Sequence, residues 1–169
     1  MQQILSSWRG YLELTKPGVQ ALLFVSCISG MLIGSNFSPP IDTFFFGLIG
    51  ISFLAASAAV INHLFDIKID AKMERTSSRP LVVGDITNNQ AIIFSVLLYM
   101  SGSWMILTFA NPLTWILTTL TFLFYGFIYT RYLKFMTSQN IVIGGLAGAM
   151  PPLLGWSAIT NTIEPNALL

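Results

Sequence analysis

The chain has 169 residues, of which 54% are hydrophobic and 9% are charged, and its mean hydropathy is +0.71. Soluble domains carry about a quarter of their residues as Asp, Glu, Lys and Arg, so this composition excludes an ordinary soluble protein and indicates lipid as the solvent. A net charge of +1 gives no basis for binding nucleic acid, and a single cysteine excludes an internal disulfide. The length allows one domain, residues 1–169.

Charged residues are missing from several long stretches of the chain, and each stretch can hold one or two membrane-spanning helices. A helix needs about 20 mainly apolar residues to cross the hydrocarbon core of a bilayer. Asn111 followed by Pro112 is a turn signal that divides the longest of these stretches. We therefore predict an all-α, polytopic transmembrane helix bundle with five spans, at residues 19–35, 43–64, 91–110, 113–129 and 141–159.

Glycines with the G-x-x-x-G spacing occur in two of these spans. Gly30 and Gly34 lie in the first span, and Gly144 and Gly148 lie in the fifth. This spacing lets helix backbones approach closely. The alternative, that these glycines have no packing role, stays open.

The basic residues predict the orientation in the membrane. Once the spans are drawn, Asp42 and Glu164 fall on one side and every basic residue falls on the other. The positive-inside rule then places the N-terminus in the cytoplasm. Residues 8–16 are too charged to cross and are expected to form a short interfacial helix. The eight basic residues are Arg9, Lys16, Lys68, Lys72, Arg75, Arg79, Arg131 and Lys134.

The segment after the second span holds the densest group of charged residues and the candidate metal ligands. Asn62, Asp66 and Asp70 are spaced four apart, so on a helix continuing from the span they form a ladder on one face. Their oxygens suit Mg²⁺, which is usually held by one or two carboxylates together with waters and substrate phosphates. Asn62 and Asp70 are about 12 Å apart along a helix. The ladder therefore implies either two ions or a helix that breaks near Asp66.

Arginines follow this ladder and complete a candidate diphosphate site. Arg75 and Arg79 are four residues apart, and guanidinium groups bind phosphate oxygens in a bidentate manner. The alternative for Lys68 and Glu74 is a solvated loop with no chemical role. We expect His63 to be a packing or interfacial residue.

The pattern N-x-x-x-D-x-x-x-D-A-x-M-x-R-T-x-x-R-P-L, at residues 62–81, resembles the first aspartate-rich motif of the intramembrane prenyltransferases. Two further stretches resemble the haem farnesyltransferase branch of that family. Residues 11–17 are similar to its opening, and residues 129–156 are similar to the segment that joins its fourth and fifth spans. The ladder alone would fit quinone and chlorophyll prenyltransferases equally well, whereas the stretch that ends at Trp156 favours the haem branch.

This resemblance implies transfer of a farnesyl group from farnesyl diphosphate to a vinyl group of protohaem IX (haem B), giving haem O. It implies Asn62, Asp66 and Asp70 as Mg²⁺ ligands and catalytic residues. Diphosphate would be bound by Arg75 and Arg79, and more weakly by Lys16 and Lys134, which could instead bind a haem propionate. It also implies a bacterial inner membrane location, an active site that faces the cytoplasm, and assembly partners among terminal oxidases.

The sequence departs from the family in two respects. Phe135 stands where a second basic residue often follows Lys134, and the later spans and second aspartate-rich motif of the family are absent. We therefore expect a chain that is truncated at its C-terminus, and whether it is active alone stays open. Two alternatives stay open: a prenyltransferase that acts on an aromatic quinone precursor, and a non-enzymatic membrane assembly or transport subunit.

Overall fold

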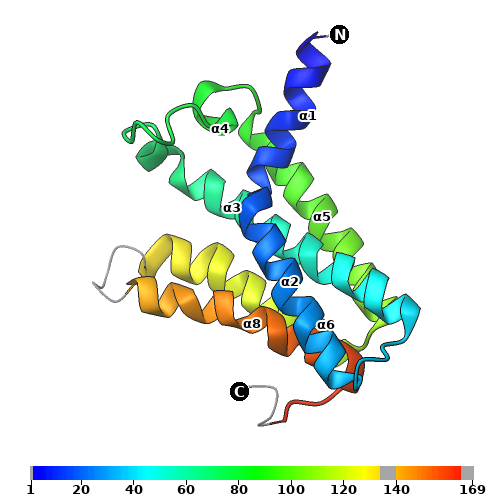
Figure 1. The fold of residues 1–169 in the computed structure, drawn as a ribbon. Helices are drawn as coiled ribbons and strands as arrows, with labels where there is room; N and C mark the ends of the chain where they lie inside the picture. The colour runs from blue at the N-terminus through cyan, green and yellow to red at the C-terminus, as the bar shows by residue number, and fades with distance from the viewer. Residues whose placement is uncertain (1, 134–139, 165–169) are drawn as a thin grey trace.

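A computed structural model describes residues 2–133 and 140–164 of the chain. These residues form helices and no strands, which confirms the all-α prediction (Figure 1). Two segments, η1 and η2, are π-helical, and both continue directly into or from an α-helix. In chain order the elements are α1 (Gln2–Leu14), α2 (Pro17–Gly34), η1 (Thr43–Gly47), α3 (Leu48–Asp70), α4 (Pro80–Val83), α5 (Asn88–Phe109), α6 (Pro112–Leu123), η2 (Phe124–Leu133) and α8 (Asn140–Thr160).

The helix α3 is the central element of the bundle. It packs against α5 over much of its length and also contacts α2, α6 and η2, whereas α2 packs mainly against α8. Buried residues occur along α3 from Leu48 to Asp70, so the helix is surrounded by protein at both ends. A helix that is apolar on all sides belongs in the interior of a bundle, and the sequence of α3 between residues 48 and 61 meets that requirement.

In the described part of the chain, four helices are long and apolar enough to cross a membrane: Pro17–Gly34, Thr43–Asp70, Asn88–Phe109 and Pro112–Leu133. They coincide with the first four predicted spans. The second continues six residues beyond the predicted end at residue 64, and these added residues include Asp66 and Asp70. The fifth predicted span, 141–159, corresponds to α8, which is not among the four. The count of five spans and the cytoplasmic N-terminus therefore stay predictions.

The turn between α5 and α6 forms where the sequence places it. α5 ends at Phe109 and α6 begins at Pro112, with Asn111 as the N-cap residue. The Asn111 side chain accepts a hydrogen bond of 2.9 Å from the backbone N–H of Thr114 and donates one of 2.8 Å to the carbonyl of Ser157. One asparagine thus caps α6 and ties it to α8.

Glycines bring the backbones of α2 and α8 into direct contact. A Cβ added to Gly30 would overlap the carbonyl of Pro152, and one added to Gly155 would overlap the carbonyl of Cys27. Gly34 also faces α8, because its added Cβ would lie 3.5 Å from the Cα of Trp156. The predicted packing role of the first glycine pair is therefore confirmed, and Gly155 supplies the reciprocal position on α8.

The second predicted glycine pair does not act as a unit. Gly144 lies against the ring of Tyr129, whereas a Cβ added to Gly148 would meet nothing within 4 Å. A further close approach joins α3 to α5, where a Cβ on Gly50 would lie 2.9 Å from the carbonyl oxygen of Gly102. Those two glycines are far apart in the sequence, so no local spacing indicates the contact.

The glycine contact gives the first prediction. Gly155→Ala should destabilise the protein by about 1–3 kcal/mol, because the added methyl forces α8 away from α2. Gly148→Ala, in the same helix but with open space around it, should leave stability unchanged or raise it slightly, since alanine is the better helix former. Thermal unfolding in nanodiscs measures both changes. Equal behaviour of the two variants would contradict the packing assignment.

Candidate functional site

The predicted ladder lies at the end of α3 and is buried. Asn62, Asp66 and Asp70 are 4%, 4% and 5% exposed, and the helix that carries them is unbroken through Asp70. The predicted alternative of a helix that breaks near Asp66 is therefore wrong. Because the helix is continuous, Asn62 and Asp70 are about 12 Å apart along its axis and do not share one ion. Neighbouring members of the ladder are one helical turn apart.

The side chain of Asn62 joins three helices. Its Oδ1 accepts a hydrogen bond from Nζ of Lys16, the residue that precedes α2. Its Nδ2 donates to Oδ2 of Asp66, at 3.2 Å, and to Oγ1 of Thr130 in η2, at 3.1 Å. The amide thus has a cationic donor on one side and two acceptors on the other, and it holds the ladder in register with both neighbouring helices.

Lys16 reaches Asn62 from an unusual backbone conformation. Its φ of 55° and ψ of 65° are left-handed, and it stands between the end of α1 and Pro17, the first residue of α2. The left-handed region costs a residue other than glycine roughly 1–2 kcal/mol, and a following proline disfavours compact conformations further. Such strain is typical of functional positions. The sharp turn directs the lysine side chain toward α3.

Arg79 is brought back to the ladder by the loop that follows α3. Its Nη1 lies 2.5 Å from Oδ2 of Asp70 in a salt bridge, and its side chain stays 23% exposed. Thr76, which is buried, donates a hydrogen bond of 3.0 Å from Oγ1 to the backbone carbonyl of Asp70. This bond folds the loop over the end of α3. The arginine therefore places a cation beside the ladder and remains partly open to a ligand.

Thr130 is a site residue that the sequence reasoning did not identify. It is 1% exposed, and its hydroxyl accepts from Asn62 and donates a 2.7 Å hydrogen bond to the carbonyl of Tyr125. That carbonyl is five residues back, which matches the spacing of the π-helix in which Thr130 lies. The only signal available was a hydroxyl residue inside the stretch 129–134, which resembles the family pattern.

Other candidates are placed differently. Arg75 is exposed, and among the described residues it forms no salt bridge with the ladder. Lys134 lies outside the described residues. His63 is 3% exposed, and within the described ranges neither ring nitrogen has a hydrogen-bond partner, so it is buried as the packing interpretation expects.

An apolar cavity of about 170 Å³ opens beside the ladder, between α2, α3, α6 with η2, and α8. Lys16, Gln20 and Tyr125 line one end, and Lys16 links this end to Asn62. The remaining walls are almost entirely apolar. The cavity and the ladder together offer a charged head site that continues into an apolar channel. The other lining residues are Val19, Leu23, Cys27, Ile51, Ser52, Leu54, Ala55, Ala58, Ala59, Thr118, Thr121, Phe122, Gly144, Ala147, Gly148, Pro151 and Leu154.

The donor set fits Mg²⁺ as an ion that is shared with a substrate. No group of three or more His, Cys, Asp or Glu side chains that could hold a metal occurs among the described residues. Mg²⁺ needs no such cage, because it is usually bound by one or two carboxylates with waters and substrate phosphates. Asp66 and Asp70, one turn apart on one face, supply two carboxylates of this kind. Asn62 is already bonded through its amide to Lys16, Asp66 and Thr130.

The hydrogen bonds of the Asn62 side chain give the second prediction. Thr130→Val removes the hydroxyl and leaves a buried Asn62 N–H unsatisfied, so the Kd for Mg²⁺-diphosphate should rise roughly tenfold. Thr130→Ser keeps the hydroxyl and should bind almost as well as the original chain. Thr119→Val, in α6 and outside the cavity lining, is the matched control. Isothermal titration measures the three constants, and an equal loss in the Val and Ser variants would contradict the role of the hydroxyl.

The chain is similar to curated membrane enzymes over nearly all of its length. It is 48% identical to protoheme IX farnesyltransferase of Saccharophagus degradans over 97% of this chain and 54% of that protein. It is 47% identical to protoheme IX farnesyltransferase of Hahella chejuensis, over 97% of this chain and 55% of that protein. The chain therefore spans about half the length of the curated relatives that it matches.

Solved structures agree in fold. A digeranylgeranylglyceryl phosphate synthase matches with a TM-score of 0.75 and 29% identity, over 89% of this chain and 51% of that chain. A UbiA homologue from Archaeoglobus fulgidus, bound to GPP and Mg²⁺, matches in fold with a TM-score of 0.73 and 20% identity, over 94% of this chain and 58% of that chain. The model of the UbiA prenyltransferase family matches residues 23–169. The chain belongs to the UbiA prenyltransferase family, as a multi-pass membrane protein with a prenyltransferase fold.

Proposed function

We propose that this protein transfers a farnesyl group from farnesyl diphosphate to a vinyl group of haem B, giving haem O. The observation that carries the proposal is the junction of a buried carboxylate ladder, two flanking cations and an apolar cavity. A ligand that suits this junction has an anionic head and a long apolar tail. Prenyl diphosphates are such ligands, and the relatives named protoheme IX farnesyltransferase support farnesyl and haem as the two substrates.

The head of the substrate would be held by charge. Lys16 and Arg79 each contact one member of the ladder, so they flank it from two different segments of the chain. Charge-assisted hydrogen bonds from such cations to phosphate oxygens are short and strong. Asp66 and Asp70 would hold Mg²⁺ against the same diphosphate. Arg75 is exposed in the adjoining loop and, with Lys134, would bind outer diphosphate oxygens or a haem propionate.

The residues of the site then stabilise cleavage of the allylic C–O bond. This bond breaks with its electron pair on the diphosphate oxygen, which leaves an allylic farnesyl cation. Lys16 and Arg79 are fixed before the reaction where negative charge develops, and fixed charges in a water-poor site are especially effective. Mg²⁺, when bound, neutralises further charge on the leaving diphosphate.

The cavity protects and guides the cation. Its apolar walls exclude water, which would otherwise capture the cation and give farnesol. Tyr125, at the polar end, has a ring whose centroid is 6.0 Å from Nζ of Lys16. An aromatic face also favours positive charge, so the ring suits the allylic carbon that becomes electron-poor. The terminal carbon of the haem vinyl group then bonds to this cation, which leaves positive charge on the vinyl carbon next to the porphyrin. Water from the polar end of the site adds to that carbon and loses a proton, which gives the hydroxylated farnesyl side chain of haem O.

The orientation proposed for the site follows from the basic residues. In the predicted topology all of them fall on the side that carries the ladder, and the positive-inside rule then supports a site at the cytoplasmic face of a bacterial inner membrane. Terminal-oxidase assembly factors are the proposed partners, because haem O is destined for those enzymes. The acceptor must then enter from the cytoplasmic leaflet.

The third prediction tests the head site. In nanodiscs with farnesyl diphosphate, Mg²⁺ and haem B, Asp66→Asn should lower the rate of haem O formation by roughly 100-fold or more, because a carboxylate that would hold Mg²⁺ against the diphosphate is lost. Lys16→Gln should weaken substrate binding by about tenfold to 100-fold. The matched controls are Glu74→Gln, which removes an exposed negative charge as Asp66→Asn removes a buried one, and Lys68→Gln, which removes an exposed positive charge as Lys16→Gln removes a half-buried one. Mass spectrometry of the haem product measures the rates.

Particular outcomes would contradict the proposal. If an aromatic quinone precursor is prenylated and haem is not, the acceptor is wrong and the alternative enzyme is right. If Asp66→Asn and Glu74→Gln behave alike, the ladder is not the head site. If farnesyl diphosphate neither binds nor reacts, the enzymatic function fails altogether.

A further inference from the structure

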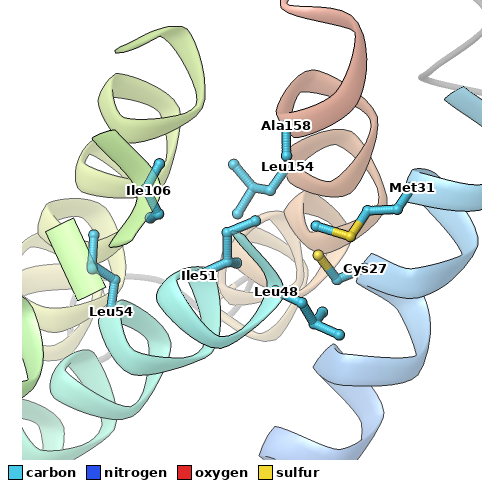
Figure 2. Packing of buried hydrophobic residues seen from close by; sticks show 8 residues of the cluster. All are labelled: Cys27, Met31, Leu48, Ile51, Leu54, Ile106, Leu154 and Ala158. Atoms are coloured by element: carbon cyan, nitrogen blue, oxygen red, sulfur yellow. The ribbon is translucent and has the colours of Figure 1, made fainter. Parts of the chain in front are cut away.

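The apolar cavity ends at a defined level within the bundle. Four of its lining residues also belong to the buried core cluster that contains Met31 and Leu48: Cys27, Ile51, Leu54 and Leu154. Leu54 lies about one turn nearer to Asn62 on α3, so the other three mark the far end. Figure 2 shows these side chains converging between α2, α3 and α8. We call Cys27, Ile51 and Leu154 the cavity floor. Beyond them the space is filled with side chains.

The distance from the head site to this floor is set by two helices. Ile51 lies three turns before Asn62 on α3, which is roughly 16 Å along the axis. On α2, which supplies the opposite wall, Cys27 lies three turns after Lys16, again roughly 16 Å. Lys16 and Asn62 are hydrogen-bonded to each other, so the two measures start from one level. Both place the floor at about the reach of an extended farnesyl chain.

The cavity cannot continue past the floor because the backbones of two of its walls meet there. Gly155 of α8 packs directly against the carbonyl of Cys27, and Gly30 of α2 packs against the carbonyl of Pro152. These contacts leave no space between α2 and α8 for an isoprene unit. The close helix contact and the end of the cavity thus occur at the same level.

Small residues of two helices line part of the cavity above the floor. Ala55, Ala58 and Ala59 line the cavity from α3, and Gly144, Ala147 and Gly148 line it from α8. Leu23, Leu54 and Phe122 are bulkier lining residues, and Ile51 and Leu154 follow at the end. A channel that is closed at one end limits the length of the chain that it can hold.

We propose that the cavity floor selects the length of the prenyl chain, admitting three isoprene units and excluding a fourth. This inference rests on the proposed function, because it assumes that the cavity holds the tail of a prenyl diphosphate. Leu154 is the principal determinant, since its side chain is 3% exposed and closes the channel from α8. A tail with one more unit must displace this side chain or bend out of the channel.

The fourth prediction is a pair of opposite changes in chain-length preference. Leu154→Ala shortens the floor residue and should raise affinity for geranylgeranyl diphosphate relative to farnesyl diphosphate by roughly tenfold or more. Ala55→Leu narrows the channel one turn above Ile51 and should shift the preference toward geranyl diphosphate by a similar factor. Leu48→Ala removes a leucine from the same core cluster that does not line the cavity, so it should leave the preference unchanged.

The measurement is competition of geranyl, farnesyl and geranylgeranyl diphosphates against labelled farnesyl diphosphate, on the full chain in nanodiscs with Mg²⁺. Ratios of affinity are compared between variants, so the partition of each lipid into the bilayer cancels. Inorganic diphosphate is titrated in parallel, and unchanged binding shows that each variant is folded at the head site. If Leu154→Ala and Leu48→Ala give the same ratio, or if Ala55→Leu does not favour the shorter chain, the inference is overturned.

The inference and the proposed function fail in different ways. Length-dependent binding that responds to Leu154 without transfer to haem would support the floor and overturn the acceptor. Transfer to haem with a length preference that does not change in Leu154→Ala would support the acceptor and overturn the floor. Because binding is measured without any acceptor present, the two results are independent.

Discussion

The amide of Asn62 is the interaction on which the site depends. A polar side chain in the interior of a membrane bundle must find partners within the protein, because lipid offers none. Asn62 finds them on α2, α3 and η2 at once, through Lys16, Asp66 and Thr130. The same bonds that satisfy the buried amide also fix the positions of a cation and a carboxylate. Stability and chemistry are served here by one set of contacts.

The sequence predicts much of this site because helical spacing is a local property. Residues four apart share a face wherever a helix continues, so Asn62, Asp66 and Asp70 could be grouped before any tertiary contact was known. The first four spans were predictable for a similar reason, because the length of an apolar stretch follows directly from consecutive residues. Gly30 was also recognisable from its spacing, although its partner Gly155 was not.

The remaining features depend on contacts between distant segments. Thr130 meets Asn62 from a π-helical segment, η2, and no spacing in the sequence indicates that change of pitch. Arg75 and Arg79 looked equivalent, yet the bond from Thr76 to the end of α3 directs only Arg79 to Asp70. The approach of Gly50 to Gly102 likewise joins two helices whose pairing follows from tertiary packing. These are effects of loop conformation and helix packing, which periodicity does not encode.

The left-handed conformation of Lys16 places two demands on one position. Glycine would adopt the backbone most easily but carries no amine, whereas any residue that supplies a cation must accept the strain. Arginine keeps the charge, but its broad planar head differs in shape from the compact ammonium that meets Asn62. No amino acid satisfies both demands fully, so lysine at this position supplies the charge at a cost in backbone strain.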